Sequence, residues 1–246
     1  MNDVSVSRPW GVRLARLAVF GGIGSAAIAA IGAYGSGWGL WDFRVGFLLL
    51  GFAVVLALLA VVGGLLSFFM DRRSIGPAGT VAGIVAAIGL LAVMGNTIVK
   101  GRQYPMIHDV STDLRSPPAF QALALRADNL AGVDTVENWQ AIHAKAYSDI
   151  QPLRLPMSQA DAMARARSIV NARGWLVTLS NDSRIEATDT VSPFRFKDDI
   201  VIVATPESGG AVTRIDVRSV SRVGVSDLGV NAKRVRALLA DLRAGV

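Results

Sequence analysis

One of the two histidines in the chain lies in a short polar segment that could support proton transfer or metal binding. His108 is followed directly by Asp109, and Asp113 comes shortly after them. An imidazole beside carboxylates is used by general acid–base catalysts and by many metal sites. A single histidine lacks the repeated-histidine spacing of a strong metal motif, however, and Asp and Thr are common in turns and caps. The segment therefore favours a structural role, and we expect no bound metal.

A second polar segment, residues 216–231, is rich in Arg, Ser, Asp and Gly and ends where a helix is predicted to begin. Free N–H groups at a helix start, together with guanidinium groups, could hold a carboxylate or phosphate. Alternatively, Ser226 or Asp227 caps the helix, and Arg218 or Arg222 pairs with an aspartate at 198–199. The residues support both interpretations equally. The candidate ligand-binding residues are Arg218, Ser219, Ser221, Arg222, Ser226, Asp227, Asn231 and Arg234, with His108, Asp109 and Asp113 as a facing wall.

Other catalytic chemistries find little support in the sequence. Ser219 or Ser221 could join His108 and Asp109 in a nucleophilic triad, but the chain lacks the G-x-S-x-G turn that would expose the serine. It also lacks a P-loop and a dinucleotide-binding glycine pattern, so we expect no cofactor. With no cysteine, thiolate nucleophiles, disulfides and Cys-ligated metals are excluded. The enzymatic alternative is a hydrolase that uses His108 with an acidic partner or a metal.

The net charge of +6 is unevenly distributed. Residues 1–102 contain eight basic and three acidic residues, whereas residues 103–246 contain seventeen basic and sixteen acidic residues. The second part therefore lacks the positive field of a nucleic-acid-binding protein, and we expect no nucleic-acid partner. Basic residues flanking apolar segments instead suit a protein that meets a lipid bilayer.

Three uncharged stretches could cross that bilayer: residues 17–34, 45–70 and 78–99. They predict a membrane domain over residues 1–102 and a soluble domain over residues 103–246. A cleaved signal peptide is the alternative for the first stretch, and it would leave the other two spans in place. Gly79 and Gly83 form a G-x-x-x-G pair. This spacing favours packing within the helical bundle over a homo-oligomer formed through the spans.

The positions of the arginines predict the orientation of the spans. Arg13 and Arg16 precede the first span, as does Arg8, and Arg72 and Arg73 separate the second span from the third. Because basic loops remain in the cytoplasm, we expect a multi-pass protein of the bacterial inner membrane. Its N-terminus would be cytoplasmic, and its C-terminal domain periplasmic.

Residues 103–246 predict an α+β domain in which a four-stranded antiparallel sheet packs against helices. A helix is expected near residues 138–146, and a clearer one begins at Ser158, which has capping-box spacing to Asp161. Four extended segments then follow, separated by the turn residues 181–183, by Pro193 and by residues 208–210. A final amphipathic helix carries Leu238 and Leu242 on one stripe and should cover the apolar sheet face.

Several motifs in this domain resemble a family of uncharacterised proteins, DUF1499. They include residues 107–113, 117–120, 147–152, 185–188 and the long run 216–234, with Gly174-Trp175 and Asp198-Asp199. The resemblance covers about residues 104–244. It implies a small domain that occurs alone or behind membrane segments, and it brings no established activity, cofactor or catalytic residue.

These observations predict a non-catalytic extracytoplasmic domain on a three-span anchor. The expected partners are the lipid bilayer and an anionic small molecule, lipid head group or envelope protein. The alternatives are the membrane-tethered hydrolase described above and a structural subunit of a membrane complex.

Overall fold

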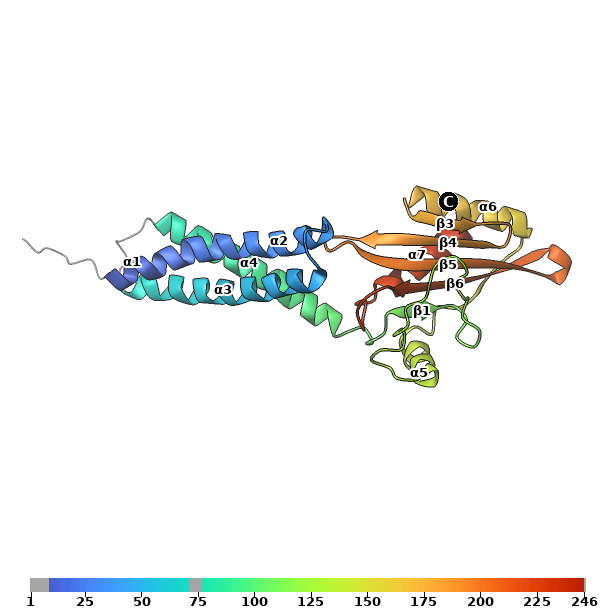
Figure 1. Cartoon of the computed structure of the whole chain (residues 1–246), viewed down its shortest axis with the longest axis horizontal. Helices are drawn as coiled ribbons and strands as arrows, with labels where there is room; N and C mark the ends of the chain where they lie inside the picture. Colours follow the sequence, from blue (N-terminus) through green and yellow to red (C-terminus); the bar gives the residue numbers. More distant parts are fainter. Residues whose placement is uncertain (1–8, 71–76, 246) are drawn as a thin grey trace, which may run out of the picture. The chain divides into compact units, whose positions relative to one another are not determined.

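The computed structural model describes residues 9–70 and 77–245, which form two compact units (Figure 1). The first unit contains the described residues up to 99 together with Ser192–Arg195, and the second contains the rest. We call them the helical unit and the α+β unit. Arg8, Arg72 and Arg73, which contribute to the expected orientation, lie outside the described residues.

The helical unit contains three helices that are long and apolar enough to cross a membrane. Helix α1 (Pro9–Arg16), a π-helical turn (Leu17–Gly21) and α2 (Gly22–Gly37) form the first helical run. Helix α3 (Phe43–Met70) and helix α4 (Pro77–Gly101) follow. The mean hydropathy of the three spans is 1.8, 3.0 and 2.1. These helices contain the three apolar stretches expected from the sequence.

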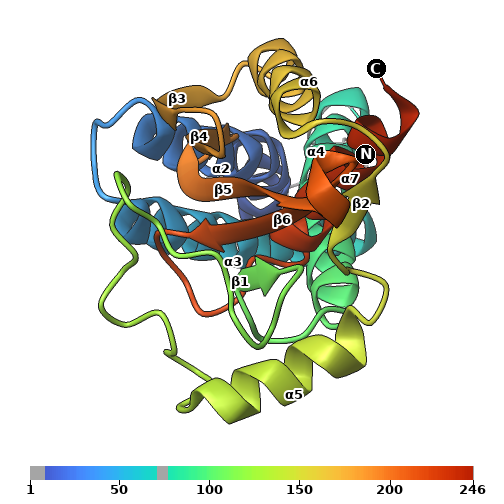
Figure 2. The same cartoon turned by 90° about the vertical axis from the view of Figure 1, so that its right-hand side faces the viewer.

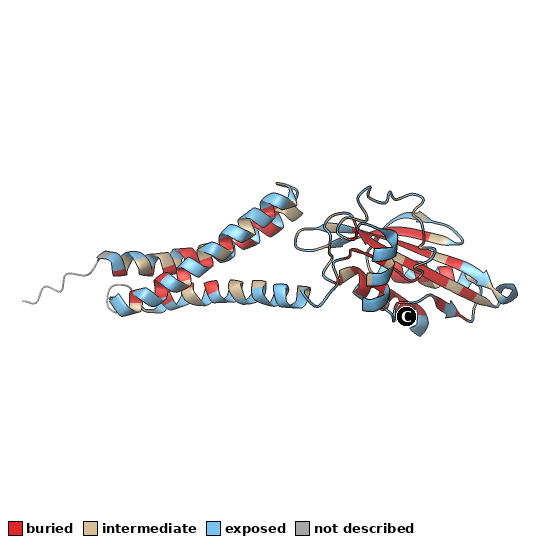
Figure 3. Cartoon of the chain, turned by 90° about the horizontal axis from the view of Figure 1, so that it is seen from below, coloured by how far each residue is buried: buried red, intermediate tan, exposed pale blue. Residues whose placement is uncertain are grey.

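Small residues face inward in this unit, and large apolar residues face outward. Ala53, Ala57 and Ala60 of α3 are fully buried, whereas Phe20 and Leu48 are 73% and 74% exposed. Most of the outer surface of these helices is exposed (Figure 3). In water this pattern would be unfavourable, but in a bilayer lipid solvates large side chains and small ones allow close helix contact.

Glycine allows α4 to approach the first helical run closely. A Cβ atom on Gly83 would lie 2.1 Å from the carbonyl oxygen of Ala18, and one on Gly22 would lie 2.0 Å from that of Gly83. Gly83, the second glycine of the G-x-x-x-G pair, therefore makes a backbone contact inside the unit that no larger residue permits. A Cβ on Gly79 would meet only the Val19 side chain, at 3.6 Å.

The α+β unit is built on an antiparallel sheet with the strand order β1-β6-β5-β4-β3. The long strands β4 (Arg184–Val191), β5 (Phe196–Glu207) and β6 (Val212–Ser221) form a meander that ends at β3 (Leu176–Ser180). These are the four strands expected from the sequence. Two three-residue strands, β1 (Asp109–Ser111) and β2 (Leu153–Leu155), were not expected, and both pair with β6.

Helices α6 (Gln159–Ala172) and α7 (Val230–Ala244) cover one face of the sheet (Figure 2). The Ser158 side chain accepts a hydrogen bond from the Asp161 backbone N–H, which confirms the predicted helix start. Helix α5 (Val136–Ala146) lies beyond β1. The side chains that form the core between the helices and the sheet include Met163, Ala166, Ile169, Val170, Ile215, Val217, Val235, Leu238 and Leu242.

The other face of the sheet is covered by irregular chain between β1 and α5. Three backbone groups of this segment, at Gln121, Ala122 and Leu123, donate to the fully buried carboxylate of Glu186 on β4, at 2.6, 2.9 and 2.9 Å. The carbonyl oxygen of Ala119 accepts from Arg184. These bonds hold the segment against this face of the sheet. The face is therefore covered in part by protein and is not fully open to solvent.

Candidate functional site

The predicted arginines are divided between the two faces of the sheet. Arg218 lies on β6 and points to the face covered by the irregular segment, because side chains alternate along a strand. Arg222 directly follows β6 and reaches Asp199 and Thr188 on that same face. Arg234 lies on α7 and reaches the opposite face. The structure therefore brings Arg218 and Arg222 onto one surface with Asp109, and it places Arg234 in a separate cluster.

Arg218 forms an ion pair that is almost completely buried. Its Nε and Nη2 atoms donate to the two carboxylate oxygens of Asp109, at 2.9 and 2.6 Å, and its Nη1 donates to the carbonyl oxygen of Pro118 at 3.3 Å. The Arg218 side chain is 11% exposed and that of Asp109 is 3% exposed. Both charges are matched inside the protein, so Arg218 has little capacity left for an external anion.

His108 lies beside this pair but does not contact the Asp109 carboxylate directly. Its Nε2 atom is 3.3 Å from Oδ1 of Asn129, and Nδ2 of Asn129 donates to Asp109 at 2.6 Å. His108 is 2% exposed, and its Nδ1 atom has no partner among the described residues. Asn129 thus separates the imidazole from the carboxylate that a catalytic triad would require as its orienting group.

Arg234 organises a polar cluster on the helix-covered face. Its guanidinium group donates to Asp189 at 2.9 Å, to Asp198 at 2.7 Å and to Oγ of Ser219 at 3.2 Å. Asn231 accepts from Arg234 and from Ser219, and it donates to Ser221 Oγ at 2.9 Å. The side chains satisfy one another in this buried cluster, which fastens the start of α7 to the sheet.

Asp227 supports the beginning of α7. Its carboxylate accepts hydrogen bonds from the backbone N–H groups of Gly229 and Asn231, at 2.8 and 2.7 Å. Burial raises the pKa of Asp227 from its ordinary value, although these two hydrogen bonds oppose the shift. Ser226 Oγ accepts from the Leu228 N–H at 3.3 Å. Both residues therefore act in the turn before α7, as in the capping interpretation.

Asp113 is tied to the other end of β6. It accepts from Nη2 of Arg214 at 2.6 Å and from the backbone N–H groups of Arg115 and Ser116, both at 2.9 Å. Burial disfavours the Asp113 charge, but these hydrogen bonds outweigh it and hold the pKa below its ordinary value. Asp113 thus belongs to a turn and an ion pair, apart from the contacts of Arg222.

Arg222 differs from the other arginines because part of its side chain faces solvent. It donates from Nε and Nη2 to Asp199, both at 2.8 Å, and from Nη2 to Thr188 Oγ1 at 3.1 Å. Its Nη1 atom donates to none of the residues that the structure describes. The side chain is 41% exposed, and its bond to Asp199 raises the pKa of Arg222 above the ordinary value.

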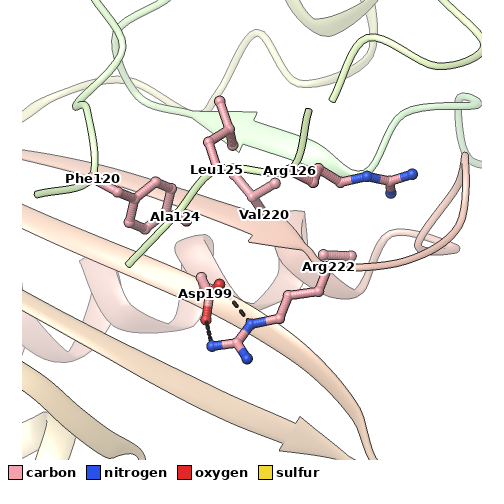
Figure 4. Close-up of a pocket in the computed structure, with 8 residues that line it drawn as sticks. Phe120, Ala124, Leu125, Arg126, Asp199, Val220 and Arg222 are labelled. Atoms are coloured by element: carbon pink, nitrogen blue, oxygen red, sulfur yellow. Dashed lines mark hydrogen bonds and ion pairs between the residues drawn. The ribbon is translucent and has the colours of Figure 1, made fainter. Parts of the chain in front are cut away.

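A shallow depression lies beside this pair (Figure 4). Arg126 approaches from the irregular segment and is held by Asp128 at 2.7 Å and by the carbonyl oxygen of Gly224 at 2.6 Å. The sequence did not indicate Arg126, because it lies in a segment without periodicity. The lining residues are Phe120, Ala124, Leu125, Arg126, Asp199, Val220, Ser221 and Arg222.

No group of three or more His, Asp or Glu side chains suited to a metal ion occurs within residues 9–70 and 77–245. The site that the structure presents is a shallow depression lined by Arg126 and Arg222, each in an ion pair, and by apolar side chains. Such a surface can receive a negatively charged group whose remainder is apolar or lies in solvent.

Comparison with known families gives one match. Residues 109–242 fit the model of the family described as "Protein of unknown function (DUF1499)". The match covers all the strands, the irregular segment and most of α7. It therefore includes the Arg218–Asp109 pair and the polar cluster around Arg234. No functionally curated protein matches the chain.

Proposed function

The chain belongs to the DUF1499 family, and from its own geometry we propose that it is a membrane-anchored, non-catalytic binding protein. Its three spans hold the α+β unit outside the cytoplasm. The unit binds an anionic group in the depression beside Arg222 and Arg126. The ligand would be a small anionic molecule, a lipid head group or an acidic group of an envelope partner.

The unequal burial of the arginines is the observation that carries this proposal. Arg222 is 41% exposed along its side chain, compared with 11% for Arg218 and 4% for Arg234. Charged groups that are fully buried and paired contribute to the fold, whereas an arginine with donors in water can still bind an anion. Arg222 is therefore the residue from which binding is expected.

The size and lining of the depression limit the class of ligand that we propose. Its enclosed space is about 10 Å³, room for roughly one water molecule, whereas complete small-molecule sites typically have roughly 300–1,000 Å³. One phosphate or carboxylate group of a larger molecule would therefore bind at its open side, against the exposed edge of Arg222. Phe120 and Leu125 provide an apolar side next to the two guanidinium groups.

A thermal-shift titration of the full chain in detergent tests the anion site. Inorganic phosphate and glycerol phosphate should raise the melting temperature of the α+β unit more than sodium chloride of equal ionic strength, because a ligand bound only to the folded state stabilises it. Arg222→Gln should abolish this shift. Asp199→Asn should preserve it, because it releases the guanidinium group from its carboxylate.

The matched control is Arg154→Gln, which removes an arginine paired with Glu207 on the same sheet. This variant should keep the phosphate-dependent shift. If Arg222→Gln keeps it as well, the anion site is disproved. If the wild-type protein shows no shift, and Arg222→Gln and Asp199→Asn destabilise it equally, the pair has only an internal role.

A further inference from the structure

Four exposed apolar side chains gather on two neighbouring loops of the α+β unit. Tyr104 and Met106, which follow α4, are 39% and 57% exposed, whereas Val225 and Leu228, which precede α7, are 40% and 47% exposed. We call these four residues the loop patch. None of them lines the anion-binding depression.

Several contacts hold the two loops together. The Asp227 N–H donates to the carbonyl oxygen of Ile107 at 3.4 Å, and Ser226 Oγ donates to that of Pro105, also at 3.4 Å. The Tyr104 ring lies so close over Gly229 that a Cβ atom there would come within 2.3 Å of it. These contacts bring the two loops that carry the patch residues side by side.

The chain itself places this surface near a bilayer. Helix α4, the last span, ends at Gly101. A Cβ atom on Gly101 would lie 3.0 Å from Cδ2 of Leu228, so Leu228 lies against Gly101 within the α+β unit. Tyr104 follows Gly101 by three residues, which limits their Cα separation to about 11 Å. Both side chains thus remain close to the head-group region, which adds roughly 5–8 Å to each side of the hydrocarbon.

The backbone at Leu228 supports a specific role for its exposed side chain. Leu228 has a φ angle of +54°, a left-handed conformation that a bulky side chain rarely adopts. Glycine or asparagine would fit this conformation with less strain. Strain of this kind persists where the surrounding structure enforces it, and it is commonly found at functional sites.

The side chains of the loop patch and its flanking basic residues are of the types that favour contact with lipid. Tyrosine prefers the membrane interface because its ring is amphipathic, and exposed leucine and methionine gain from leaving water. Lys100 and Arg102, both exposed, provide positive charge beside anionic head groups. We propose that the loop patch is a lipid-contacting surface that inserts Tyr104, Met106, Val225 and Leu228 into the interface of the bilayer spanned by α4.

The chain has no cysteine, so single labelling sites can be introduced without background. The full chain carrying Leu228→Cys, labelled with bimane, would be reconstituted into vesicles of phosphatidylcholine with a minor share of phosphatidylglycerol. Nitroxide-labelled phosphatidylcholine should quench this label. The matched control is Ala211→Cys, an exposed position before the start of β6, at the strand end opposite residues 222–229. Its label should be quenched several-fold less.

A second labelled variant, Met106→Cys, covers the case in which Leu228→Cys fails to fold, and it should behave in the same way. The proposal is overturned if the patch labels are quenched no more than the label at position 211. It is also overturned if these labels are protected from aqueous iodide but not quenched by lipid, because a protein partner would then cover the patch. The anion site is tested with phosphate in solution and the loop patch by lipid quenching of its own labels, so failure of the anion site and failure of the loop patch can be distinguished.

Discussion

Arg218 on β6 and Arg222, which directly follows this strand, lie on the same face of the sheet, but burial gives them different roles. Arg218 and Asp109 form a pair that is almost completely removed from water. Removal of one member of such a pair typically costs about 3–5 kcal/mol, since the other charge remains buried without compensation. Arg222 makes an equally regular pair with Asp199, but it keeps a hydrogen-bonding edge in solvent. The density of polar residues in the sequence identified both arginines, but it could not show which of them is accessible.

His143 is a buried acceptor whose protonation opposes folding. Its Nε2 atom accepts a hydrogen bond from the Ser111 N–H at 3.2 Å, and its ring lies between those of Trp139 and Tyr147. Desolvation lowers the pKa of His143 to about 4 from 6.5, although the negative charge of Asp109 opposes the shift. The neutral form is therefore the one that fits the fold.

We predict that His143 makes the α+β unit sensitive to mild acid. The unfolded chain binds a proton at this residue below pH 6.5, whereas the folded protein resists protonation until about pH 4. Stability should therefore fall as the pH decreases from about 6.5 to 4, by roughly 3 kcal/mol from this residue alone. Denaturant unfolding at a series of pH values measures the loss.

The variant His143→Gln removes this titration while keeping a side-chain acceptor. Its stability should depend less on pH between about 4 and 6.5 than that of the wild-type protein. Asp227 acts in the opposite direction because its pKa is raised, so the difference between variant and wild type isolates the histidine. Equal pH dependence of the two proteins would show that His143 does not titrate as described.

At the scale of elements, the local sequence pattern predicted the long strands. The short strands β1 and β2 and the irregular segment depend on tertiary contacts instead. The turns at residues 181–183, at Pro193 and at residues 208–210 separate β3, β4, β5 and β6 as expected. Strands β1 and β2 have only three residues each, so no periodicity could reveal them. The irregular segment is fixed by Glu186, more than sixty residues away in sequence, which explains why Arg126 and Asn129 were missed.

Glu186→Gln should release this irregular segment. The substitution removes the charge that receives three backbone N–H groups and Arg184, and hydrogen bonds to charged groups contribute about 1.5–3 kcal/mol each. Hydrogen exchange should accelerate at residues 119–126, and the phosphate-dependent thermal shift should decrease. Glu207→Gln, which disrupts an exposed pair on β5, is the control and should leave exchange in this segment unchanged. Unchanged exchange in Glu186→Gln would contradict this account of the segment.

At the scale of the whole molecule, composition divides the chain into an apolar part and a nearly neutral part. The uncharged stretches correspond to helices with small residues inside and large apolar residues outside. The nearly neutral remainder folds around its own core of helices and sheet. Charge and hydropathy do not reveal a ligand, because the proposed anion site depends on side chains brought together by folding.

Alkaline phosphatase fusions test the central claim most directly, namely that three spans carry a binding domain out of the cytoplasm. The phosphatase is active only where its disulfides form, outside the bacterial cytoplasm. A fusion after Val246 should be active, and a fusion after Arg73 should be inactive at comparable expression. Activity of the Arg73 fusion together with inactivity of the Val246 fusion would place the α+β unit in the cytoplasm and contradict the account.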